Sequence, residues 1–141
     1  MRRRAMIFLV MCLSVCGLSA MSCASSYSVP VRAMPAGATF DGLWYTNFGE
    51  MRIRQTADGR VSGTFAFRTG GEFEGEVVGG VMKFRWTQPG DFQVGRREVV
   101  GRGYLVISDD GLNMAGQWGY GDDYVGGGEW TGEKATEIYR R

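Results

Sequence analysis

Histidine is absent from this chain of 141 residues, and its three cysteines all lie before residue 24. A chain without imidazole has no Ser-His-Asp or Cys-His catalytic site and no histidine-bound metal. Because residues 24–141 lack cysteine, that part has no disulfide, no thiol nucleophile and no cysteine-bound metal. No acid–base pair stands out in the sequence either. We therefore expect a protein that is not an enzyme and that holds no metal or cofactor.

A hydrophobic run long enough for a permanent membrane helix is also lacking. The longest apolar run covers residues 5–18 and follows three arginines, an order typical of an export signal. The next five residues, Ser-Ala-Met-Ser-Cys, resemble the lipobox of bacterial lipoproteins, with alanine at position 20 where leucine is usual. The resemblance implies a signal peptide over residues 1–22 and lipidation of Cys23. An ordinary secretory signal cut nearby is the alternative.

Export and lipidation would attach the protein to the bilayer of the cell envelope. The residue after Cys23 is alanine, whereas an aspartate there would resemble an inner-membrane retention signal, so we expect the outer membrane. The full chain has 16 basic and 15 acidic residues, and loss of the three leader arginines leaves 13 basic residues, a net charge of −2. This charge excludes nucleic acid as a partner.

Proline is scarce, with three residues, whereas glycine is abundant, with 23. Residues 24–39 are rich in Ser, Ala and Pro without periodicity, which predicts a flexible tether between Cys23 and a domain over residues 40–141. The domain repeats the phrase apolar-x-Gly-x-aromatic. Its clearest copies are Phe40-x-Gly42-x-Trp44, Val61-x-Gly63-x-Phe65, Met114-x-Gly116-x-Trp118 and Gly126-x-Gly128-x-Trp130. Together with looser copies, this period of two predicts an all-β fold, an eight-stranded antiparallel up-and-down (meander) barrel.

Tight turns predict which residues face one another on neighbouring strands. A two-residue turn at 79–80, a three-residue turn at 57–59 and a three-residue turn at 69–71 give the register. The predicted pairs are Phe73 with Trp86, Gly75 with Phe84, Met51 with Phe65, Phe67 with Phe73, and Phe65 with Gly75. Asp109-Asp110-Gly111 has the makeup of another tight turn rather than of a calcium site.

The run from Gly42 to Gly49 resembles the first strand of the calycin superfamily, the lipocalins and avidins. The resemblance implies a basic residue from the last strand, Lys134 or Arg140, over the ring of Trp44. The avidin biotin site is not matched. Its polar donor positions are occupied here by Thr46, Glu50, Phe65 and Phe67, and an unpaired buried ureido group would be costly.

Strand parity places three tight turns at one end of the barrel, together with the tether, and the long connections 88–98 and 121–127 at the other. Inward aromatic residues near the long loops are candidates for contact with a small apolar or aromatic ligand. These are Phe67, Trp86, Trp118, Tyr120 and Trp130. A core filled by side chains is the alternative. The long loops hold candidates for contact with an envelope protein. These are Phe92, Arg96, Arg97, Asp122, Asp123 and Tyr124.

The sequence thus favours a membrane-anchored, non-catalytic binding module that takes a small apolar or aromatic ligand at the open end of its barrel. Two alternatives remain open. One is an interaction or inhibitor lipoprotein with a solid core that acts through its long loops, and the other is a structural protein of the envelope.

Overall fold

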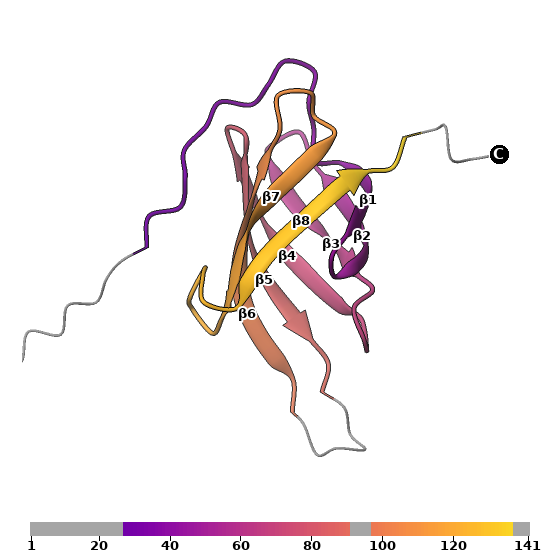
Figure 1. Ribbon diagram of the computed structural model, residues 1–141, viewed down its shortest axis with the longest axis vertical. Helices are drawn as coiled ribbons and strands as arrows, with labels where there is room; N and C mark the ends of the chain where they lie inside the picture. The colour runs from indigo at the N-terminus through magenta and orange to yellow at the C-terminus, as the bar shows by residue number, and fades with distance from the viewer. Residues whose placement is uncertain (1–26, 91–96, 137–141) are drawn as a thin grey trace, which may run out of the picture.

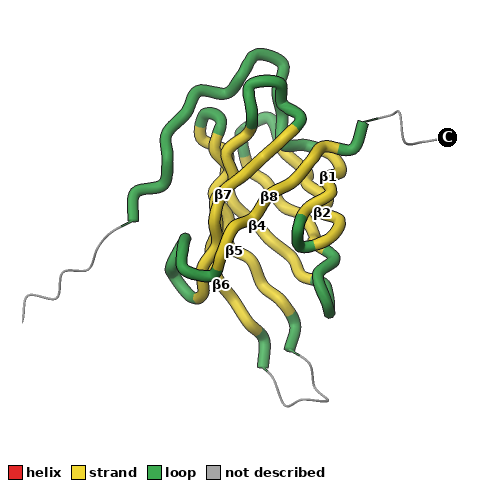
Figure 2. Tube along the Cα trace, in the orientation of Figure 1, coloured by secondary structure: helices red, strands yellow, loops and turns green. Residues whose placement is uncertain are grey.

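The computed structural model describes residues 27–90 and 97–136. The predicted signal peptide, the lipidation site Cys23, the loop candidates Phe92 and Arg96, and Arg140 lie outside the described residues. Figure 2 shows strands and loops throughout the described part. No helix in that part is long and apolar enough to cross a membrane.

Eight antiparallel strands form a closed barrel in which each strand pairs with its neighbours in the sequence (Figure 1). The strands are β1 (Gly42–Thr46), β2 (Gly49–Gln55), β3 (Arg60–Phe65), β4 (Gly71–Val78), β5 (Val81–Gln88), β6 (Val99–Ile107), β7 (Asn113–Tyr120) and β8 (Gly128–Lys134). The predicted all-β meander barrel is therefore confirmed, and its architecture is consistent with a calycin-like barrel. We call the end with the β2–β3, β4–β5 and β6–β7 turns the hairpin end, and the opposite end the loop end.

The observed register confirms the predicted pairs around two of the turns. Across β4 and β5, Phe73 faces Trp86. Across β2 and β3, Met51 faces Phe65. Both turns therefore place large apolar residues of neighbouring strands side by side on the inner face of the barrel.

The predicted register between β3 and β4 is wrong. Phe65 faces Gly71 rather than Gly75, and Phe73 faces Gly63 rather than Phe67. The observed and predicted pairings differ by four residues. Because four is an even number, the same side chains still point inward, and the alternation of the sequence could not distinguish the two registers.

The reason for the shift is that the connection is centred on residue 68, two residues before the centre of the predicted turn at 69–71. Residues 66–70 join β3 to β4, and two of them have left-handed backbone, Arg68 (φ 52°) and Gly70 (φ 75°). Glycine adopts this conformation readily, but arginine does so rarely. The sequence therefore indicated a left-handed backbone at Gly70 but not at Arg68.

The ring closes between β1 and β8, which share three residue pairs. There, Lys134 Nζ lies 5.2 Å from the ring centroid of Trp44, and it donates a hydrogen bond to Thr39 O at 2.7 Å. Burial lowers the pKa of Lys134, and the charge of Asp41 acts in the opposite direction. The predicted cation over Trp44 is confirmed for Lys134.

Apolar side chains fill the middle and the hairpin end of the barrel. The largest fully buried side chains of this core are Trp44, Phe40, Met51, Met82, Leu105 and Ile107. Trp44 Nε1 donates a hydrogen bond to Phe40 O at 2.7 Å, so the one polar atom of that indole is satisfied. Core glycines leave room for neighbouring rings: a Cβ at Gly103 would lie 2.7 Å from Cζ of Phe84. Such pairs let a small barrel bend without voids.

The segment before the barrel packs against it instead of acting as a free tether. We call residues 27–39 the strap. At the hairpin end, Gly80 N donates a hydrogen bond to Arg32 O at 2.7 Å, and the Arg32 side chain pairs with Asp109. Met34 and Ala38 pack against the barrel core. The expectation of a flexible coil is therefore wrong for this part of the segment.

The residues that precede Arg32 in the strap lie along the outer wall of the barrel (Figure 1). Tyr27 stacks on Tyr104 of β6 with ring centroids 5.8 Å apart, and their hydroxyl oxygens lie 2.6 Å apart in a hydrogen bond. Burial, with the hydrogen bond to Tyr27 as a second cause, raises the pKa of Tyr104 to about 12. Tyr104 lies midway along β6, so the strap reaches the middle of the wall.

Candidate functional site

A pocket of about 500 Å³ opens at the loop end of the barrel. We call it the mouth pocket. Its lining comes from five strands and from three of the loop-end connections. The lining residues are Phe48, Phe65, Phe67, Arg68, Trp86, Gln88, Val99, Trp118, Tyr120, Gly127 and Trp130. Seven of these eleven residues are aromatic, so the surface offered to a ligand is mainly that of flat rings.

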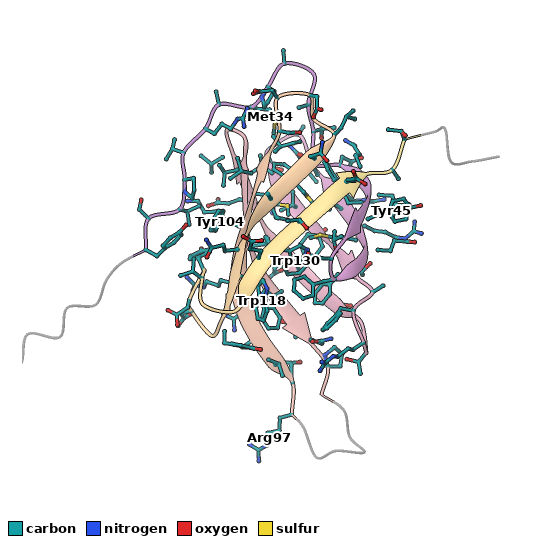
Figure 3. All side chains as sticks on the ribbon, in the orientation of Figure 1. Met34, Tyr45, Arg97, Tyr104, Trp118 and Trp130 are labelled. Carbon is teal, nitrogen blue, oxygen red and sulfur yellow. The ribbon has the colours of Figure 1, made fainter. Side chains whose placement is uncertain are left out.

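The aromatic rings support one another by edge-to-face contacts. Phe48 contacts Phe67, Trp118 and Trp130 at centroid distances of 5.2, 5.7 and 5.0 Å. Trp118 also packs against Trp86 at 5.7 Å. Figure 3 labels Trp118 and Trp130 in the loop-end half of the barrel. Phe48, Trp118 and Trp130 each contact three other rings, so these three side chains link the lining into one aromatic cluster.

The polar side-chain groups of the mouth pocket are few. Arg68 lies at the rim, with Cζ 5.0 Å from the ring centroid of Phe67. Gln88 Nε2 donates a hydrogen bond to Phe67 O at 2.7 Å, which ties the β3–β4 connection to β5. Within the described residues, the buried Nε1 atoms of Trp118 and Trp130 have no hydrogen-bond partner. A buried donor without a partner is uncommon in a folded protein and calls for an explanation.

All five residues predicted as ligand contacts lie in this lining. Four of them have the inward parity of their strands, and Phe67 lies in the β3–β4 connection. Tyr120 lies at the rim and is 58% exposed, whereas Trp130 is 3% exposed. The pattern of the sequence did not single out Phe48, Arg68 or Gln88. Phe48 and Arg68 stand in connections between strands, where alternation gives no information about direction.

The barrel is filled over part of its length and open at one end. Side chains fill the middle and the hairpin end, where Leu105 and Ile107 are fully buried. The mouth pocket occupies the loop end. A ligand there would rest on the packed core rather than pass through the barrel.

The loop candidates that the structure describes, Arg97, Asp122, Asp123 and Tyr124, do not line the mouth pocket. Asp122 pairs with Arg102 of β6 at 2.9 Å, and the Arg102 guanidinium carbon lies 5.6 Å from the ring centroid of Tyr124. Arg102 and Tyr124 line a separate hollow of about 740 Å³ on the outer face of β3–β6. Asp123 and Arg97 are exposed, and Figure 3 shows Arg97 beyond the loop end. These residues therefore face several directions.

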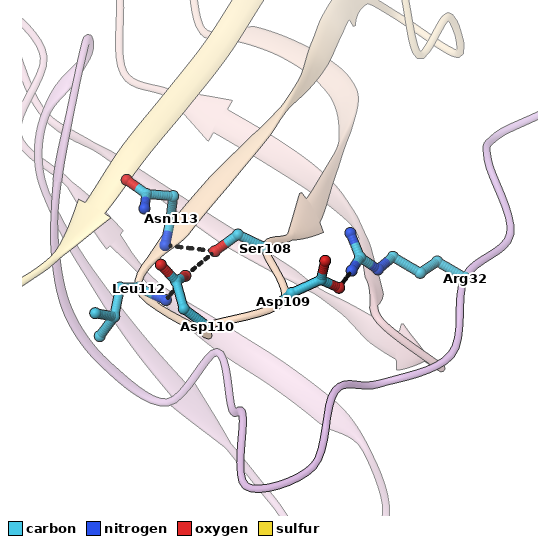
Figure 4. A network of polar contacts seen from close by, with 6 residues as sticks. All are labelled: Arg32, Ser108, Asp109, Asp110, Leu112 and Asn113. Carbon is cyan, nitrogen blue, oxygen red and sulfur yellow. Dashed lines mark hydrogen bonds and ion pairs between the residues drawn. The ribbon is translucent and has the colours of Figure 1, made fainter.

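The carboxylates at the hairpin end serve turns. Asp110 Oδ1 accepts hydrogen bonds from Ser108 Oγ and Leu112 N, and the Ser108 hydroxyl accepts one from Asn113 N (Figure 4). This arrangement confirms the predicted tight turn at Asp109-Asp110-Gly111. Among the described residues, no three His, Cys, Asp or Glu side chains come together as a metal-binding group.

Comparison of the chain with protein-family models, curated proteins and solved structures gives no match. Barrels of this architecture serve many unrelated functions, so the fold by itself assigns none. The function has to be argued from the mouth pocket and from the sequence before the barrel.

Proposed function

We propose that this protein is a non-catalytic binding module, anchored to the cell envelope through a lipid on Cys23, that takes a small apolar or aromatic molecule into the mouth pocket. The observation that carries the proposal is the concentration of seven aromatic side chains around one open pocket above a packed core. Apolar concave surfaces of this kind are typical ligand sites in the mouths of β-barrels.

The exposure of this aromatic lining to solvent also supports a binding role. Contiguous exposed apolar surface is rare on soluble domains and usually marks a binding site. The chemistry of the lining supports binding over catalysis, because its only titratable side chains are Arg68 and Tyr120. Neither a carboxylate nor an imidazole lines the pocket to act as an acid or a base.

Binding can be tested with naphthamide, a flat neutral aromatic probe, and the tryptophan fluorescence of the protein. The Cys23→Ser chain suits this experiment, since it lacks the proposed lipidation site and needs no detergent. We expect saturable quenching and a rise in melting temperature. Tyr120→Ala should weaken binding several-fold, because the ring at the rim is removed. Tyr45→Ala is the matched control, since Tyr45 is similarly exposed (50%, against 58% for Tyr120) and lies on β1 outside the pocket.

Absence of saturable binding, or equal losses in the two tyrosine variants, would contradict a ligand site in the mouth pocket. The anchor is tested separately by fractionating cells that express the native chain or Cys23→Ser. The native chain should sediment with membranes, and in the outer-membrane fraction, whereas the variant should be released. A Cys23→Ser chain that stays on membranes would refute the lipid anchor.

A further inference from the structure

Arg68 has an unusual backbone for its residue type. With a φ of 52°, it is the only residue other than glycine that has a positive φ among the described residues. A side chain with a Cβ is disfavoured in this conformation, and glycine or asparagine is the usual choice. Strained positions of this kind tend to occur at functional sites. The left-handed backbone therefore makes Arg68 a candidate for a role other than folding.

The side chain of Arg68 brings a positive charge to the mouth pocket. Its guanidinium lies over the ring of Phe67, which itself lines the pocket. Among the eleven lining residues it is the only one that carries a formal charge. No carboxylate of the described residues lies within 4.0 Å of it. The nearby carboxylates Glu72 and Glu98 line a different hollow on the outer side of the same connection.

The chemistry of the Arg68 side chain indicates what kind of group it would bind. A guanidinium is always charged, donates hydrogen bonds and never accepts them. Arg68 therefore favours a ligand whose head group is an anion with acceptor oxygens.

From these observations we infer that the mouth pocket selects aromatic carboxylates, with the flat ring held among Trp86, Trp118 and Phe67 and the carboxylate paired with Arg68. The inference rests on the proposed function and names the ligand class of the same pocket. A planar guanidinium matches a carboxylate through two parallel hydrogen bonds. The aromatic walls supply most of the affinity, and Arg68 supplies the preference for the anion.

The test compares naphthoate with naphthamide, which share one ring system and differ in the charge of the head group. Both are titrated into the Cys23→Ser chain, into the same chain with Arg68→Gln, and into a control with Arg54→Gln. Arg54 is an exposed arginine of β2 outside the pocket. Naphthoate should bind more tightly than naphthamide to the chain with native Arg68. Arg68→Gln should weaken naphthoate by about three- to ten-fold and naphthamide by less than about two-fold.

Salt gives an independent readout of the ion pair. Raising the ionic strength should weaken naphthoate binding and leave naphthamide binding unchanged. Arg54→Gln should alter neither affinity. Arg68→Gly serves as a second variant, because glycine fits the left-handed backbone and keeps the barrel folded if glutamine does not.

The outcomes separate the two proposals. Equal affinities for the two probes, or a naphthoate affinity that is the same in Arg68→Gln and Arg68→Gly as in the native chain, would overturn the assignment of Arg68 and leave the aromatic pocket standing. Failure of both probes to bind any of the chains would overturn the ligand pocket itself. Loss of naphthoate affinity in Arg54→Gln as large as in Arg68→Gln would show a general charge effect and also contradict the inference.

Discussion

Asn47 shows how one side chain can extend a strand. β1 ends at Thr46 after three residue pairs with β8. Beyond it, Asn47 N donates a hydrogen bond to Thr131 O at 3.2 Å. Its side chain donates from Nδ2 to Glu129 O and accepts at Oδ1 from Thr131 N, both at 2.9 Å. The amide thus continues the ladder of hydrogen bonds at the seam where the barrel closes.

Removal of this amide should loosen the seam. We expect Asn47→Ala to lower the free energy of unfolding by about 1–2 kcal/mol, because two hydrogen bonds to backbone groups are lost. Asn47→Asp should also destabilise, since a carboxylate cannot donate to Glu129 O. Urea unfolding followed by circular dichroism measures both effects. Asn113→Ala is the control, because Asn113 is also an exposed asparagine, at the start of β7, and its side chain forms none of the hydrogen bonds in the described residues. An equal loss in the control would contradict a special role for Asn47.

At the scale of the strands, the sequence predicted which elements exist and which face each presents, but not every connection. The period of two located the eight strands and placed Phe73, Met82 and Leu105 inside. It could not distinguish two β3–β4 registers that differ by an even number of residues. Choosing between them requires the backbone conformation of residues 66–70. The sequence does not indicate the left-handed conformation of Arg68, because arginine rarely adopts it.

The observed β3–β4 register makes a prediction about Gly71. A Cβ at this position would lie 2.1 Å from Cζ of Phe65, which faces Gly71 across the strand pair. We expect Gly71→Ala to destabilise the barrel by about 1–3 kcal/mol through overpacking. In the background of Phe65→Leu, which removes the ring, the same substitution should cost less. A double-mutant cycle by urea unfolding measures this coupling. Additive effects of the two substitutions would contradict the observed contact.

Two hairpin-end turns should make stability depend on acid pH. Hydrogen bonds from Thr56 and Arg60 lower the pKa of Asp58, and those from Ser108 and Leu112 lower the pKa of Asp110. A carboxyl group whose pKa is lower in the folded state stabilises the fold above its unfolded value of 3.8, and this contribution is lost as the pH falls through the folded pKa. The melting temperature should therefore drop below about pH 4. The double variant Asp58→Asn, Asp110→Asn should show a smaller drop between pH 5 and pH 3, and an unchanged drop would contradict this account.

At the scale of the whole molecule, the candidate ligand site was predictable to the extent that it is built on strands. Inward parity and strand order alone place Trp86, Trp118 and Trp130 together at one end of the barrel. Phe48 and Arg68 complete the pocket from connections, and their directions depend on turn geometry that alternation does not encode. The strap likewise escaped prediction. Its contacts pair side chains and backbone with β4–β6 without a repeating pattern in the sequence.

The strap affects how a lipid anchor would orient the barrel at a membrane. A free tether would leave from the hairpin end and point the mouth pocket away from the bilayer. Instead, the described chain begins at Tyr27, against Tyr104 in the middle of β6. Three residues separate Tyr27 from Cys23, and the four Cα–Cα steps between the two span at most about 14 Å. A lipid on Cys23 would therefore hold the β6 wall toward the bilayer, with the mouth pocket opening sideways along the surface.

Single-cysteine labelling can test this orientation, because residues 24–141 contain no cysteine of their own. Gln117 faces Tyr104 across β6 and β7, whereas Arg54 is exposed on β2, four strands around the ring from β6. We expect a fluorophore on Gln117→Cys to be quenched more strongly than one on Arg54→Cys when the anchored chain sits on vesicles with quencher-labelled head groups, since quenching requires contact. Without the anchor, in the Cys23→Ser chain, neither label should be quenched. Equal or reversed quenching in the anchored chain would show that the strap does not set the orientation.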